Sequence, residues 1–342
     1  EDVFDFICNA VINANEDDDS NKPDDKEPWQ TGINRARGVA GELLVDCSIF
    51  DKQYGDRIFS VLNSIADNAS ITTRAAILLN GARLNMIDPN RSLELYMKMM
   101  HDCQPTLISI PLHDLNPVVY YINYGFDKLI PLYKEAIQKP ACHKVLAETL
   151  WIAYVKDKNG SADLLKEVIH SSQDAATSFI MAVVRYHTVP LSKSLELLID
   201  LMSCKDEKIG QTLGNVYNSS EYWFPKDLVN YTKEYVKHDC CRYATRSFYE
   251  FLSGFAKDEP ATSLEWIITV YQKKKPHFRD DQNGRFDVQK ILEILTQSYN
   301  GVRKYSPRDE LVEKAMDIMD EIMQDPESRE YLRGFLNELD RS

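Results

Sequence analysis

Two stretches decide the fold: residues 33–44 read INRARGVAGELL, and residues 70–79 read SITTRAAILL. Each places an arginine among small and aliphatic residues that are spaced for one face of a helix. Arg37 and Arg74 hold the same place in the two stretches, 37 residues apart. Helical patterns restart about every 35 residues from Asn34 onward, and such a period is typical of a solenoid, whose units bury their apolar faces against one another. We therefore predict an all-α fold, an α-solenoid of antiparallel helix pairs.

The composition suits this fold. Of the 342 residues, 44% are hydrophobic and 10% aromatic, which is enough for a sizeable core, and glycine is scarce at 13 residues. The net charge of −13 gives the chain no general electrostatic reason to bind nucleic acid or anionic membranes. We expect a protein partner instead.

Cysteine usage and the N-terminus indicate the compartment. Seven widely spaced cysteines lie mostly in apolar helical segments, which predicts reduced core thiols and a cytoplasmic location. No apolar stretch approaches the ~20 residues needed to span a membrane. The chain begins with Glu1-Asp2-Val3 and has no basic leader, so no secretory signal is expected, and the missing Met suggests a fragment of a longer protein.

We divide the chain into three parts. Residues 1–14 are expected to form a short amphipathic helix, and residues 15–32 an acidic flexible linker. A Ca²⁺ loop in the linker is the sharper alternative, but the turn glycine and the closing Glu at fixed spacing are absent. The α-solenoid is expected to occupy residues 33–342.

Helix starts are marked by local signals. Asp88 and Ser70 can cap helices, and Pro89, Pro140, Pro190 and Pro225 suit a first helical turn. Residues 107–110 are interpreted as an extended linker because prolines bracket them. The predicted helices are 34–47, 54–67, 70–85, 89–101, 115–124, 126–138, 141–156, 160–170, 173–187, 191–203, 206–217, 226–237, 240–256, 259–272, 286–300, 308–324 and 327–340.

The segments 34–42 and 72–76 resemble HEAT-like repeats, in which an inner helix carries an early Arg followed by small apolar residues. The wider layout is similar to the helical C-terminal regions of large bacterial NACHT- or STAND-type NTPases of antiviral defence. The resemblance implies a sensor that recognises a ligand while a separate N-terminal NTPase oligomerises. No phosphate-binding Gly-x-x-x-x-Gly-Lys-Ser/Thr run occurs here, so ATP would enter only through an NTPase domain outside this chain.

Two segments are candidate partner-binding sites. Residues 217–225 are rich in aromatic side chains, which anchor interfaces but serve equally well as local core plugs. Residues 273–279 form a basic run that can contact phosphate, although the interpretation favoured here is a solvated loop whose lysines meet a helix C-terminus. The candidate contact residues are Tyr217, Tyr222, Trp223, Lys273, Lys274, Lys275, His277, Phe278 and Arg279.

Signals for chemistry are weak. His238, Cys240 and Cys241 lack a second ligand pair at zinc-finger spacing, so a helix cap with buried thiols is the preferred interpretation. His101-Asp102-Cys103 is suggestive by composition alone, and no nucleophile elbow or His-Glu-x-x-His motif is present. We predict no catalytic residue, no metal and no cofactor.

Three functions follow, in order of preference. The first is a protein-binding module, the sensing region of an NTPase-type defence protein. The second is a stand-alone scaffold that holds partners together. The third is an all-α enzyme with a site in a groove, which requires residues that only the fold would bring together.

Overall fold

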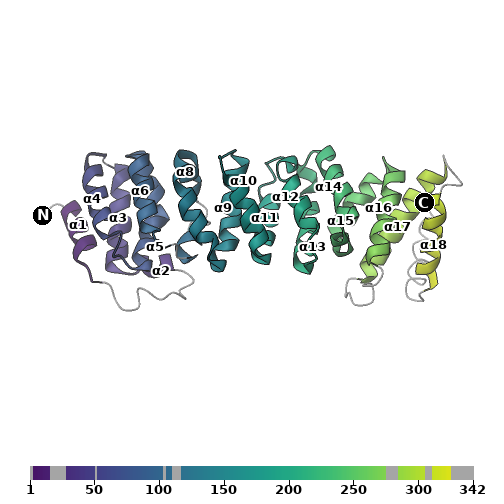
Figure 1. Ribbon diagram of the computed structural model, residues 1–342, viewed down its shortest axis with the longest axis horizontal. Helices are drawn as coiled ribbons and strands as arrows, with labels where there is room; N and C mark the ends of the chain where they lie inside the picture. Colours follow the sequence, from purple (N-terminus) through teal and green to yellow (C-terminus); the bar gives the residue numbers. More distant parts are fainter. Residues whose placement is uncertain are drawn as a thin grey trace. The chain divides into compact units, whose positions relative to one another are not determined.

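The computed structural model describes residues 3–15, 28–50, 52–102, 105–109, 117–274, 284–304 and 310–324. Within these ranges every regular element is helical and no strand occurs, so the all-α prediction is confirmed. The chain divides into two compact units, Glu1–Phe179 and Ile180–Ser342. Figure 1 labels their helices along the chain. None of the described helices is both long and apolar enough to cross a bilayer.

The first unit packs its helices largely in chain order. Helix α1 lies against α3 and α4, α2 and α3 lie against α5, and α8 and α10 lie against α9. Its α-helices are α1 Val3–Asn13, α2 Pro28–Ile33, α3 Ala36–Phe50, α4 Gly55–Ile65, α5 Ile71–Asn80, α6 Pro89–Met99, α7 Pro105–Ser109, α8 Pro117–Ile137, α9 His143–Val155 and α10 Ser161–Ser171. Helix α11, Gln173–Arg185, continues into the second unit.

The second unit mixes α-helices with shorter 3-10 turns. Helix α16 packs against α17, both contact α18, and α13 packs against η8. The elements are η6 Leu191–Lys193, α12 Leu195–Met202, α13 Glu207–Gly214, η7 Asn215–Tyr222, α14 Pro225–Lys237, η8 Asp239–Tyr243, α15 Arg246–Phe255, α16 Pro260–Lys274, α17 Gly284–Arg303 and α18 Glu310–Gln324.

Polar contacts recur at a nearly constant sequence separation within each unit. Lys98 Nζ donates to the Asn63 carbonyl 35 residues earlier, and Lys139 Nζ to the Asp102 carbonyl 37 residues earlier. In the second unit, Ser219 Oγ donates to the Val184 carbonyl at a separation of 35. Lys273 Nζ donates to the Lys237 carbonyl at a separation of 36. At these four places, segments 35 to 37 residues apart in the sequence lie side by side.

Small residues let helices approach closely. A side chain at Gly32 would overlap the Thr72 carbonyl, so α2 rests directly on the backbone of α5. Ala75 and Ala76 on α5 are fully buried.

Local helix signals are accurate. The Asp88 carboxylate accepts from the backbone N–H groups of Asn90 and Arg91 at 2.9 and 3.1 Å, and Ser70 Oγ accepts from Thr73 N–H at 3.2 Å. The helical backbone of α8 is interrupted at Gly125, where the predicted helices 115–124 and 126–138 meet.

The interpretation of residues 107–110 as extended is wrong for 107–109, since α7 runs from Pro105 to Ser109. Proline is tolerated in a first helical turn, and burial of Leu107 and Ile108 favours the helix. The linker prediction for 15–32 is wrong for 28–32, because helix α2 begins at Pro28 and packs against α5. Residues 16–27 and the predicted helix 327–340 lie outside the described residues.

Candidate functional site

The aromatic segment after α13 divides into a buried and an exposed part. Tyr217 is 1% exposed, and its hydroxyl donates to Thr232 Oγ1 at 3.1 Å. Its ring lies 5.6 Å from Tyr231, 5.7 Å from Tyr235 and 5.1 Å from Phe248, measured between centroids. Burial raises the pKa of Tyr217, Tyr231 and Tyr235 well above the ordinary value, which keeps these phenols neutral. Tyr217 is thus a core residue of the second unit.

Trp223 is also buried, and its indole N–H finds no acceptor among the described residues. Of the two interpretations of residues 217–225, packing in the local core therefore applies to Tyr217 and Trp223. Tyr222, in contrast, is 57% exposed, and Phe224 is 69% exposed.

Tyr222 stacks on the half-buried His187, and we call this stack, with the exposed Tyr186 and Phe224 one and two residues away in the sequence, the aromatic ledge. The His187 and Tyr222 rings stack with centroids 4.1 Å apart and planes 23° apart. The stack joins residues 35 apart, the same spacing as the Ser219–Val184 hydrogen bond beside it. A hydrogen bond to the Glu221 carboxylate raises the pKa of Tyr222. Tyr222 is therefore held by two partners, the His187 ring and the Glu221 carboxylate.

The basic run has internal partners where the structure describes it. Lys273 Nζ donates to the Val236 and Lys237 carbonyls at 3.0 and 2.6 Å, at the C-terminal end of α14. Helix C-termini carry unpaired carbonyls and a partial negative charge, so a lysine is favoured there. The interpretation as a solvated loop is wrong for Lys273 and Lys274, because both belong to α16, and Lys273 meets the C-terminus of α14 and not that of the helix from which the run extends.

Lys274 is buried and lies 2.5 Å from the Asp287 carboxylate. The predicted contact residues Lys275, His277, Phe278 and Arg279 lie outside the described residues.

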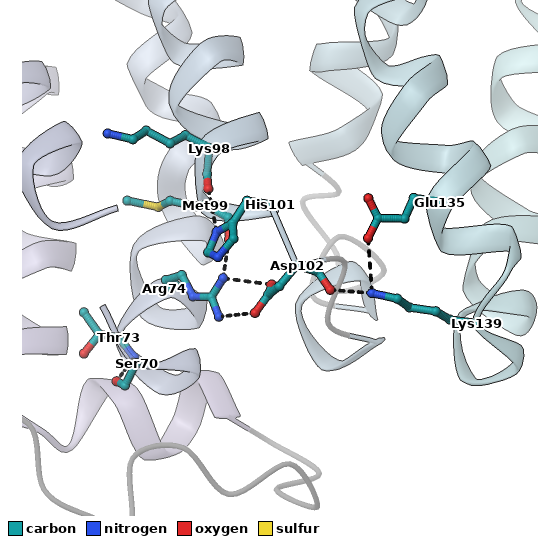
Figure 2. A network of polar contacts seen from close by, with 9 residues as sticks. All are labelled: Ser70, Thr73, Arg74, Lys98, Met99, His101, Asp102, Glu135 and Lys139. Carbon is teal, nitrogen blue, oxygen red and sulfur yellow. Dashed lines mark hydrogen bonds and ion pairs between the residues drawn. The ribbon is translucent and has the colours of Figure 1, made fainter. Parts of the chain in front are cut away.

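A second polar network lies in the first unit (Figure 2). Arg74 on α5 donates from both terminal nitrogens to the Asp102 carboxylate at 2.9 and 2.8 Å, and to the Met99 carbonyl at 2.8 Å. Lys139 Nζ reaches the Asp102 carbonyl at 2.5 Å. Arg37, which has the equivalent place in sequence, donates to the Val11 carbonyl at 2.8 Å. Both arginines thus bind a carbonyl in the last turn of a neighbouring helix.

This network bears on the His101-Asp102 pair. His101 Nδ1 lies 3.0 Å from the Lys98 carbonyl and the ring is exposed, whereas the Asp102 carboxylate faces Arg74. In Figure 2 the imidazole and the carboxylate do not pair. A carboxylate that orients a catalytic histidine would have to bond its ring nitrogen. The arrangement suits a structural clasp.

The cysteines beside His238 are buried thiols. Burial raises the pKa of Cys240 to about 12 and of Cys241 to about 11, so both stay protonated at neutral pH. Their sulfurs lie 3.9 and 3.7 Å from the carbonyls of Tyr235 and Val236. In the part of the chain that the structure describes, no three His, Cys, Asp or Glu side chains are grouped to hold a metal ion.

Sequence reasoning missed Tyr186, His187 and Phe224 as members of the ledge. The signal that could have found His187 is the repeat itself, because one 35-residue step from His187 arrives at Tyr222. Comparisons with protein-family models, with curated proteins and with solved structures each found no match to this chain.

Proposed function

We propose that this chain is a protein-binding module built as an α-solenoid of HEAT-like antiparallel helix pairs. The proposal is supported by the recurrence of polar contacts at separations of 35 to 37 residues in both units. Such contacts arise when each unit of a repeat stacks on the next. Proteins of this architecture mostly act by binding other molecules.

The aromatic ledge is the contact surface that we assign to the second unit. The observation that carries the assignment is the stack of the exposed Tyr222 on the half-buried His187, with the exposed Phe224 two residues further along the chain. Aromatic side chains bury much area on binding at low cost in conformational entropy, and tyrosine is common among residues that dominate binding energy. A ring that is already stacked loses little further freedom when a partner covers it.

We further propose that the module is the ligand-sensing region of a bacterial NACHT- or STAND-type NTPase and works in the cytoplasm. The support is the resemblance of residues 34–42 and 72–76, together with the shared place of Arg37 and Arg74. In that setting, ligand binding would shift the parent protein between conformations by its differential affinity for them.

The ledge can be tested by capture with a matched control. The purified chain is immobilised and exposed to lysates of bacterial cells with and without phage infection, and bound proteins are identified by mass spectrometry. We expect the Tyr222→Ala/Phe224→Ala variant to lose about tenfold or more of the captured partner, because truncating an interface anchor costs on the order of 2 kcal/mol or more. Tyr124→Ala is the control, since Tyr124 is 59% exposed and belongs to the first unit.

The outcomes separate the alternatives. Equal capture by the ledge variant and the parent chain would exclude the ledge as the site. Capture that appears only after infection supports the sensor, whereas the same partner from both lysates favours a scaffold.

A further inference from the structure

The chain contains four Asn-Gly pairs, and one of them lies in an exposed turn between two helices. The pairs are 80–81, 159–160, 283–284 and 300–301. In such a pair the side-chain amide is readily attacked by the next backbone nitrogen, because glycine has no side chain to obstruct the approach. Asn283 lies outside the described residues, and the other three pairs differ in how the backbone holds them.

Asn159 and Gly160 belong to the short connection between α9 and α10. The N–H of Lys158 donates to the Ala153 carbonyl at 3.1 Å, and the N–H of Ser161 donates to the Lys158 carbonyl at 3.1 Å. Within the part of the chain that the structure describes, the N–H groups of Asn159 and Gly160 have no acceptor. The Gly160 nitrogen is therefore not engaged in a hydrogen bond that would have to break before it reacts.

The backbone holds the other two pairs more firmly. At the end of α5, the N–H of Gly81 donates to the Leu78 carbonyl. The pair 300–301 lies within α17, where each N–H bonds to the carbonyl four residues back. Asn300 is exposed, as Asn159 is, so exposure does not distinguish these two side chains. Backbone hydrogen bonding does.

Water has access to the turn. Asn159 is exposed and lines a surface cavity of about 200 Å³. The side-chain amide therefore meets both a free backbone nitrogen and solvent, which are the two reactants that ring closure and ring opening require.

We propose that Asn159–Gly160 is a site of spontaneous deamidation and isoaspartate formation in the folded chain, and that 80–81 and 300–301 are protected from it. The Gly160 nitrogen forms a bond to Asn159 Cγ, the bond from Cγ to the amide nitrogen breaks, and ammonia leaves with the proton of the Gly160 nitrogen. Water then opens the cyclic imide at either carbonyl. One product is aspartate, and the other is isoaspartate, in which the main chain passes through Cγ.

Both products change the connection between α9 and α10, which pack against each other. Each adds a negative charge just before the first turn of α10, and the isoaspartate also lengthens the main chain by one methylene. Because the reaction needs only water, the converted fraction grows with the age of each molecule. The inference is independent of what the chain binds.

Ageing of the full chain at mildly alkaline pH tests the proposal. Folded chain and chain unfolded in guanidinium chloride are digested at intervals, and mass spectrometry measures deamidation at Asn80, Asn159 and Asn300. The unfolded chain is the matched control, because it keeps each local sequence and removes the structure. We expect folding to slow the reaction at Asn80 and Asn300 about tenfold or more, since each ~1.4 kcal/mol of local opening free energy lowers the rate tenfold. Asn159 should react in the folded chain at nearly its unfolded rate.

Asn159→Gln is the second variant. Its longer side chain closes a larger ring much more slowly, so isoaspartate should disappear from the peptide that contains residue 159, while the peptides with Asn80 and Asn300 behave as in the parent chain. If folding slows Asn159 as much as Asn300, the turn is not a reactive site and the proposal is wrong. Equal rates at the three asparagines in the folded chain would also contradict it, because the backbone would then select none of them.

Discussion

At the scale of single residues, Arg74 shows how a repeat position becomes a structural contact. Its guanidinium is 5% exposed and binds Asp102 through two parallel hydrogen bonds as well as the Met99 carbonyl. We expect Arg74→Met to lower the free energy of unfolding of the first unit by about 2–3 kcal/mol. The expected loss of stability is small for the removal of one partner from a buried ion pair, because the Asp102 side chain is partly exposed to solvent.

Urea unfolding followed by circular dichroism measures this loss. Arg246→Met is the control, since the Arg246–Glu250 pair is exposed on both sides and such pairs contribute about 0–1 kcal/mol. If Arg74→Met and Arg246→Met lower the free energy of unfolding equally, the Arg74–Asp102 pair contributes no more stability than an exposed ion pair.

Glu42 makes stability depend on pH. Burial, and the nearby Asp46, raise the pKa of its carboxyl in the folded chain, although Asn80 donates to it at 2.8 Å. A raised pKa means that folding favours the protonated form. This contribution is complete below the ordinary glutamate pKa and is lost as the pH rises through the folded pKa. At pH 7 the ionised carboxylate therefore carries a penalty that a neutral amide avoids.

We expect Glu42→Gln to melt at a higher temperature than the parent chain at pH 7.5 and at the same temperature near pH 4. Glutamine keeps a carbonyl oxygen for the Asn80 amide. Melting curves across this range measure the difference, with Glu94→Gln at an exposed position as the control. A difference that stays constant from pH 4 to 7.5 would argue against the titration of Glu42.

At the scale of elements, two glycines should respond in opposite directions to the same change. Gly160, before α10, has a φ of 78°, and an added Cβ would lie 3.3 Å from Ile130. We expect Gly160→Ala to destabilise the first unit by about 1–2 kcal/mol, since the left-handed region disfavours a side chain. Gly254, within α15, has open space around its Cα, so Gly254→Ala should stabilise by about 0.5–1 kcal/mol. Thermal melting of both variants checks the signs.

Helix starts could be predicted from sequence because their causes are local. Asp88 and Ser70 cap the backbone two or three residues ahead, and short-range chemistry decides such positions. The run at 107–109 was misjudged because β-branching and flanking prolines are equally consistent with a short buried helix, and only tertiary packing separates the two.

The candidate site could be predicted only in part. The sequence singles out the aromatic segment, but the exposure of Tyr222 and the burial of Tyr217 depend on how the surrounding helices pack, which composition does not reveal. The same holds for Lys274, whose partner Asp287 lies on the far side of the connection between α16 and α17. These contacts form between elements, so the residue types alone do not reveal them.

At the scale of the whole molecule, the two units hold separate sets of contacts. Arg74 belongs to the first unit, and Tyr217 belongs to the second unit. We expect hydrogen exchange, measured by mass spectrometry, to quicken mainly in peptides of residues 1–179 for Arg74→Met and of residues 180–342 for Tyr217→Ala. The double variant should show the sum of the two effects, because sites that share no partner are additive. Faster exchange throughout the chain in either single variant would indicate one cooperative unit.

The buried tyrosine cluster of the second unit has a consequence for spectroscopy. Ionised phenol absorbs near-ultraviolet light that neutral phenol does not, and Tyr217, Tyr231 and Tyr235 resist ionisation while they stay buried. In an alkaline titration these three phenols should stay neutral after Tyr222, which is 57% exposed, has ionised. Their late appearance would mark the opening of one half of the chain, so this half contains its own optical reporter without any added label.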